Sequence, residues 1–129
     1  MILIDSSVWI DYFNGIYNQK TDFLYSNLGR EEFVIGDLIY TEVLQGFSDE
    51  RSYRKAKELL DVFPFKNIGG KEIALSSAKN YRILRKKGVT IRKTVDVFIA
   101  TFCIENNVSL LQNDRDFEPF IRLFNLQSI

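Results

Sequence analysis

The chain has 129 residues and no net charge, with 17 lysines and arginines against 17 aspartates and glutamates. It contains no histidine and one cysteine, which excludes Ser-His-Asp and Cys-His nucleophiles, histidine-ligated zinc, thiolate clusters and internal disulfides. The length fits one domain over residues 1–129, and a hydrophobic content of 46% can fill its core. An enzyme of this composition depends mainly on carboxylates and a hard cation.

The first half of the chain alternates short apolar runs with helical patterns. Residues 2–4 are continuously apolar, as in a strand buried on both faces, and Ser6 begins a helix. Residues 33–35 predict a second strand, and the helix after it ends near Gly46. Residues 51–61 predict a further helix. This alternation is typical of an α/β domain.

The second half continues the same alternation. Residues 71–87 predict an amphipathic helix that is capped by Gly88, and one stripe of it contains Ala74, Ala78, Tyr81 and Leu84. Residues 97–104 are apolar nearly all round, which predicts a helix buried against the sheet. Residues 108–111 predict another strand, and residues 121–126 a last strand near an edge. We therefore expect a doubly wound parallel sheet with helices on both faces.

The start of the chain and its cysteine indicate a cytoplasmic protein. Residues 1–5 run directly into a strand pattern without the basic and apolar regions of a leader. The longest uninterrupted apolar stretch, residues 97–100, is too short to cross a bilayer. Cys103 in an apolar segment is typical of a small core residue in a reducing compartment.

Acidic residues fall where the predicted strands end. Asp5 follows the first strand, Glu42 lies about one turn into the helix after the second, and Asp96 begins the buried helix. Asp114 and Asp116 follow the later strand. Because ligands of open α/β sheets bind beyond the carboxyl ends of the strands, all five acids can reach one site.

Such a gathering of negative charge favours a cation. Two carboxylates about 4 Å apart repel by roughly 4 kcal/mol at an effective dielectric constant near 20. The group must therefore take up protons or bind a hard ion with oxygen ligands, for which Mg²⁺ or Mn²⁺ is the best match. Phosphodiester hydrolysis by metal-activated water needs no histidine, so this chemistry is open to the chain.

Each acid taken alone also has a structural explanation. Asp5 can cap the following helix, and Asp96 can interact with a helix dipole. Glu42 can be an exposed helix residue, while Asp114 and Asp116 lie in a stretch rich in turn residues. Only their shared position at one sheet end favours a functional site.

Four segments resemble the motifs of the PIN-domain family, and specifically its VapC-type toxin ribonucleases: residues 2–10, 41–46, 94–100 and 113–117. The resemblance implies a three-layer α/β fold with about five parallel strands and helices on both faces. It also implies a Mg²⁺- or Mn²⁺-dependent endoribonuclease that is the toxin of a type II toxin–antitoxin pair.

The same resemblance assigns roles to the acids. Asp5 and Asp96 match the family's most dependable metal ligands, and Glu42 matches the acid that completes the ligand set or binds through water. The fourth position is shared by Asp114 and Asp116, since family members differ over which is used. We favour Asp114 as the nearer ligand, with Asp116 either joining it or anchoring the loop.

Substrate contacts are expected from two hydroxyls and a basic segment. The resemblance implies that Ser6 or Ser7 holds a metal-bound water or the scissile phosphate. Residues 79–93 contain seven lysines and arginines and no acid, and Arg82 and Lys86 share a helix face there. This segment can attract a phosphate backbone, or it can be an ordinary solvated helix face.

The resemblance also implies partners. It predicts a homodimer, a cognate antitoxin that silences the enzyme, and higher toxin–antitoxin assemblies. Aromatic residues on the first two predicted helices, among them Trp9, Tyr12 and Phe13, are mostly core by their spacing but can form an apolar groove for an antitoxin helix.

Other functions stay open at this point. One is a housekeeping RNA-processing PIN nuclease without an antitoxin, and another is a non-catalytic PIN module that binds RNA or protein. A phosphotransfer receiver domain is disfavoured, because Ser6 and Ser7 follow Asp5 where such a domain has a second acid. An RNA-cleavage assay and the presence of an adjacent antitoxin gene discriminate between these functions.

Overall fold

A computed structural model describes residues 1–129. Its four strands, seven α-helices and one 3₁₀ turn follow in the order β1 (Ile2–Ile4), α1 (Ser6–Phe13), α2 (Gln19–Asn27), β2 (Phe33–Gly36), α3 (Asp37–Leu44), α4 (Glu50–Leu60), β3 (Phe65–Lys66), α5 (Lys71–Lys86), α6 (Thr94–Asn106), β4 (Ser109–Leu111), η1 (Arg115–Phe117) and α7 (Glu118–Phe124).

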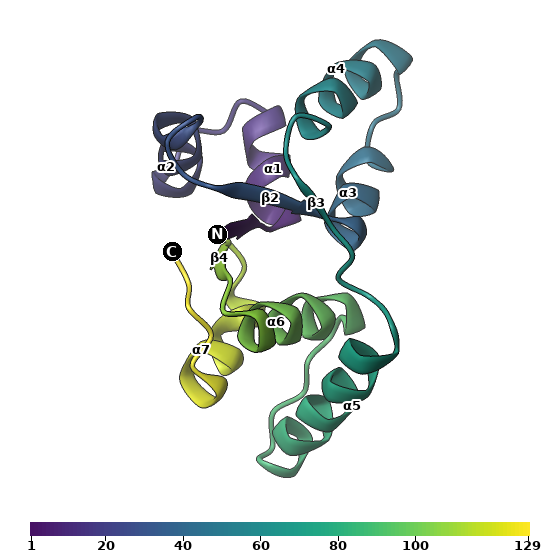
Figure 1. The fold of residues 1–129 in the computed structure, drawn as a ribbon, viewed down its shortest axis with the longest axis vertical. Coiled ribbons are helices and arrows are strands. Elements are labelled where there is room, and N and C mark those ends of the chain that lie inside the picture. Colours follow the sequence, from purple (N-terminus) through teal and green to yellow (C-terminus); the bar gives the residue numbers. More distant parts are fainter.

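The strands form one parallel sheet in the order β3-β2-β1-β4. Ile2 of the central strand β1 pairs with Phe33 on one side and with Ser109 on the other. Helices α1 to α4 lie on one side of the sheet and α5 to α7 on the other (Figure 1). This arrangement confirms the predicted α/β fold, with helices on both faces of a parallel sheet.

A single cluster of 28 buried hydrophobic residues draws on the sheet and both helix layers. Helix α6 contributes to it from nearly all round, since Val97, Ile99, Ala100, Phe102 and Cys103 are all buried. The prediction of a buried helix over residues 97–104 is therefore confirmed.

None of the helices is both long and apolar enough to cross a membrane.

The predicted strand over residues 121–126 is wrong. Residues 118–124 form helix α7, with Pro119 in its first turn. Phe117 and Phe120 are both fully buried and stand three residues apart, which is a helical spacing. The aromatic and β-branched residues of the segment favour a strand and obscure this spacing in the sequence. The sheet consequently has four strands and not five, and only an isolated bridge between Leu110 and Ser128 extends it beyond β4.

Helix α5 buries most of the predicted stripe. Leu84 is buried and Ala74 and Tyr81 are half-buried, whereas Ala78 is exposed and Ser77 is buried. The C-terminal cap is as predicted, because Gly88 has a φ of 79°, which a glycine adopts without strain.

Gly36, between β2 and α3, is expected to tolerate no side chain. A Cβ there would lie 2.0 Å from Cδ1 and 2.8 Å from Cγ1 of the fully buried Ile68. We expect Gly36→Ala to lower the free energy of unfolding by about 1–3 kcal/mol, as overpacking in a core does. Urea denaturation measures the change.

Gly69→Ala is the matched control. A Cβ at Gly69 meets no atom within 4 Å, so this variant is expected to unfold like the wild type. Equal urea midpoints for the two alanine variants would contradict the tight packing of Gly36 against Ile68.

Candidate metal centre

The five acids identified in the sequence lie at the carboxyl end of the parallel sheet. Asp5 caps α1 directly after β1, and Glu42 projects from α3, which follows β2. Asp96 stands in the first turn of α6, and Asp114 and Asp116 belong to the turn that follows β4. The parallel order of the strands thus gathers residues that are far apart in sequence, as the sequence predicts.

Three of these acids are arranged so that one cation could contact all of them. Asp96, Asp114 and Asp116 each offer a carboxylate oxygen, and these oxygens are all within 4.8 Å of one another. Asp5 and Glu42 lie outside this trio but close enough for their charges to raise the pKa of Asp96. The site is therefore a trio of aspartates bordered by two further carboxylates.

Three carboxylate oxygens of the site are buried without a hydrogen-bond partner: Oδ1 of Asp5, Oε1 of Glu42 and Oδ2 of Asp96. A buried acceptor that stays unpaired costs about 1–3 kcal/mol, and more when it is charged. Oxygen ligands that are shielded from water and free of donors are suited to Mg²⁺ or Mn²⁺. The residues present therefore fit a hard divalent cation.

Burial and mutual repulsion raise the pKa of three of the acids. Burial is the main cause of the raised pKa of Asp5, of Glu42 and of Asp96, which reaches about 7. The neighbouring carboxylates act in the same direction on each of them. Lys93 opposes the rise at Asp96 and Glu42. The centre consequently favours protons when no other cation is present.

Ser7 holds Asp5 in place. Oδ2 of Asp5 accepts hydrogen bonds from the Ser7 backbone N–H at 3.0 Å and from the Ser7 hydroxyl at 2.6 Å. The same hydroxyl accepts the Asn113 N–H at 3.0 Å, which ties α1 to the turn after β4. Ser6 is partly buried, and its hydroxyl lowers the pKa of Glu42. Ser7 therefore positions Asp5 and leaves Oδ1 of Asp5 free.

Two basic residues just before α6 contact the acids, although the sequence did not single them out. Lys93 Nζ lies 3.8 Å from Oδ2 of Asp114, and an Arg92 nitrogen lies 3.0 Å from Oδ2 of Asp116. Their position in the sequence, a few residues before Asp96, could have indicated that they lie near the acids. Both belong to the basic segment, 79–93.

The two basic residues that the sequence did single out lie elsewhere. Arg82 and Lys86 are exposed on α5 and form no ion pair with the acids. Arg82 lines a groove between α5 and α6 that includes Thr94, at the start of the helix that carries Asp96. Lys86 is not among the residues that line this groove.

Asp11 is a further supporting residue that sequence reasoning missed. Its Oδ2 accepts hydrogen bonds from Nδ2 of Asn18 at 3.1 Å and from Nδ2 of Asn113 at 3.2 Å. Asp11 lies four residues after Ser7, so both face the turn after β4, and this helical spacing was the available signal.

The raised pKa values predict an unusual pH dependence for metal-free protein. The carboxyl of Asp96 has a pKa of 3.8 when unfolded and about 7 when folded, so the folded chain binds more protons between these values. The free energy of unfolding should therefore fall as the pH rises from about 4 to about 7. Thermal unfolding in EDTA measures this slope.

Asp96→Asn removes the carboxyl whose pKa rises to about 7 and is the comparison for this experiment. We expect the variant to show a flatter profile and to be more stable than the wild type at pH 8. A melting temperature that rises steadily from pH 4 to 8 in both proteins would contradict the raised pKa of Asp96.

Comparisons with known proteins agree with this fold. The family model of the PIN domain matches residues 2–121. A VapC ribonuclease of Mycobacterium bovis is 29% identical over 130 residues, which cover 99% of this chain and 97% of the relative. Ribonuclease VapC11 of Mycobacterium tuberculosis matches to the same extent.

Solved structures share the architecture. VapBC2 of Rickettsia felis, bound to a promoter DNA fragment, superposes with a TM-score of 0.79 at 17% identity and covers 100% of this chain and 98% of its own. VapBC-1 of Haemophilus influenzae gives a TM-score of 0.76 at 22% identity, with 100% and 97% covered. Because the family match extends over all four strands and all five acids, the chain belongs to the PIN domain family.

Proposed function

We propose that this chain is a Mg²⁺- or Mn²⁺-dependent endoribonuclease and the toxin of a toxin–antitoxin pair. The observation that carries the proposal is the set of buried, unpaired carboxylate oxygens on Asp5, Glu42 and Asp96 beside Asp114. The relatives that share nearly the whole length of the chain are named ribonucleases, which supports RNA as the substrate.

Each acid has a proposed role. Asp5, Glu42, Asp96 and Asp114 are the catalytic carboxylates and hold the cation, and Asp116 joins them or anchors the loop through Arg92. When bound, a divalent ion polarises a phosphoryl oxygen and lowers the pKa of bound water. The carboxylates position this chemistry, since their elements fix them at one sheet end.

The basic segment is proposed to guide RNA toward the centre. Arg82 and Lys86 are exposed on α5, and Arg92 and Lys93 reach the acids themselves. A positive surface that leads to a metal centre attracts a phosphate backbone in a salt-dependent manner. Ser6 stays a proposed contact for water or phosphate, whereas the Ser7 hydroxyl is engaged by Asp5.

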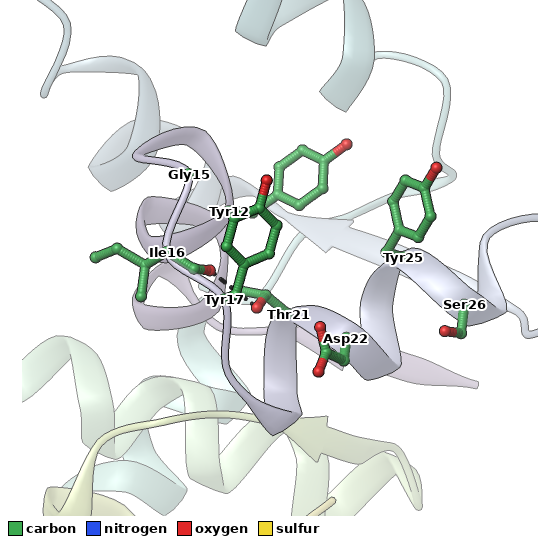
Figure 2. A pocket seen from close by; sticks show the side chains of 8 residues that line it. All are labelled: Tyr12, Gly15, Ile16, Tyr17, Thr21, Asp22, Tyr25 and Ser26. Carbon is green, nitrogen blue, oxygen red and sulfur yellow. Dashed lines mark hydrogen bonds between the residues drawn. The ribbon is translucent and has the colours of Figure 1, made fainter.

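A cognate antitoxin is proposed to dock on α1 and α2. A hollow of about 650 Å³ lies there, lined by three tyrosines with Ile16, and the tyrosine hydroxyls point to the same side (Figure 2). Tyr17 is 89% exposed and Tyr25 is 72% exposed, an unusual exposure of aromatic surface. An amphipathic segment of a partner would cover such a surface.

A second groove has one of the acids, Glu42, in its lining. It has a volume of about 180 Å³ between α1 and α3, and its lining includes Ile10, Phe13, Phe47 and Glu42. A partner in this groove would therefore approach the acids. One solved structure of this fold is a toxin–antitoxin complex by name, which supports such a partner. The proposed homodimer has apolar contacts available in the exposed Leu75 and Ile83 of α5.

The enzyme proposal predicts the effect of neutralising single acids. Asp5→Asn and Asp96→Asn are each expected to reduce cleavage of a mixed RNA pool by at least about a hundredfold, because each removes a charge that holds the cation. Cleavage should require Mg²⁺ or Mn²⁺ and stop in EDTA. Gel analysis of partner-free protein measures the rates.

Glu105→Gln is the matched control for these variants, since Glu105 is an exposed acid at the far end of α6. It should cleave like the wild type. Full activity of folded Asp96→Asn, or no cleavage by any of the proteins, would contradict the proposal.

The toxin proposal predicts a partner on the α1–α2 face. The double variant Tyr17→Asp, Tyr25→Asp should lose co-purification with the proposed antitoxin, sought as the product of a small adjacent gene, and escape its inhibition of RNA cleavage. Both side chains are largely exposed, so folding should be retained. Co-expression followed by gel filtration and the cleavage assay measures both effects.

Val62→Asp is the control, because Val62 is 74% exposed on the loop after α4 and lies outside the proposed groove. Equal retention of the partner by both variants would place the antitoxin elsewhere. Absence of any inhibition by the neighbouring protein would favour a housekeeping nuclease.

A further inference from the structure

A polar hollow of about 440 Å³ lies directly beside the metal centre. Seven residues line it, and none of them is hydrophobic: Lys20, Arg92, Gln112, Asn113, Asp114, Arg115 and Glu118. Asp114 belongs both to this hollow and to the aspartate trio. A ligand in the hollow therefore lies next to whatever binds at the acids.

The hollow carries three basic side chains against two acids, one of which, Asp114, also faces the proposed cation. Arg92 pairs with Asp116 but stays 75% exposed. Lys20 donates to the Ile129 carbonyl at 2.5 Å. Arg115 is exposed and forms no ion pair. The hollow consequently offers guanidinium donors to an anion, with Arg115 the least engaged.

Hydrogen bonds fix the lining of the hollow. The Asp114 N–H donates to Oε1 of Gln112 at 2.7 Å, and Asn113 is held by Ser7 and Asp11. The side chain of Asp114 in turn caps η1, the turn that begins with Arg115. These hydrogen bonds at Asn113 and Asp114 thus fix the position of Arg115 relative to the acids.

We propose that this hollow binds a backbone phosphate of the RNA next to the bond that is cleaved, and that Arg115 and Arg92 are its contacts. The inference rests on the proposed ribonuclease function and adds a substrate-binding subsite to it. Guanidinium groups pair with phosphate oxygens through two parallel hydrogen bonds, and the open polar hollow admits a strand rather than an apolar ligand.

A binding experiment that does not depend on cleavage tests the subsite. Fluorescence anisotropy measures binding of a short labelled single-stranded RNA, in Mg²⁺, to Asp96→Asn protein with or without Arg115→Ala. The second substitution should weaken binding about tenfold, the loss expected for one charge-assisted contact. It should also reduce the slope of log K against log salt by about 0.7.

Two further variants sharpen the experiment. Adding Arg92→Gln should weaken binding again, while Arg51→Ala on the exposed surface of α4 should leave it unchanged. In otherwise wild-type protein, Arg115→Ala should raise KM with little change in kcat. Equal affinity with and without Arg115→Ala would overturn the subsite. It would also be overturned if RNA binding weakened only in a separate Arg82→Glu, Lys86→Glu variant.

The outcomes separate the subsite from the enzyme. Failure of wild-type protein to cleave RNA contradicts the proposed function, whereas the affinity comparison alone decides on the hollow. Unchanged melting temperatures establish that the exposed Arg115 and Arg92 do not act through folding.

Discussion

Burial of carboxylates, which also repel one another, at one end of the sheet is the constraint on which the site depends. Asp5 and Asp96 are each 3% exposed, and both carry an oxygen without a partner. A folded chain holds such groups only because the surrounding core fixes them, and a cation relieves the cost. In our account, the same buried carboxylates therefore lower the stability of the sheet end and favour the binding of a cation.

Capping a helix does not exclude an acid from the proposed metal site. Asp5 caps α1 with one carboxylate oxygen and leaves the other free, and Asp114 caps η1 while one of its oxygens belongs to the trio. Structural and functional explanations of an acid in the sequence are thus compatible. Capping fixes each side chain without using all of its oxygens, which is how a ligand becomes preorganised.

Strong local patterns made much of the fold predictable. The continuous apolar runs at residues 2–4 and 33–35 and the all-apolar helix over 97–104 have one natural place, inside a parallel sheet sandwich. Helix α2 was not predicted, because it is largely polar and depends on an Asn18 capping box. Helix α7 was mistaken for a strand because a short aromatic run carries little periodicity.

The position of the five acids followed from the order of the strands. The positions of Arg92, Lys93 and Arg115 depend on how the turns fold, which the sequence pattern does not indicate. Their proposed roles, and those of the acids, stay predictions.

Calorimetric titration of metal-free protein with Mn²⁺ near pH 7, in buffers of different ionisation enthalpy, tests the central claim most directly. Since the pKa of Asp96 is about 7, a cation bound at these carboxylates must displace protons. We predict saturable binding with proton release in the wild type, and weaker binding with less proton release in Asp96→Asn. Absence of binding in folded wild-type protein, or binding that is indifferent to Asp96→Asn, would contradict the account.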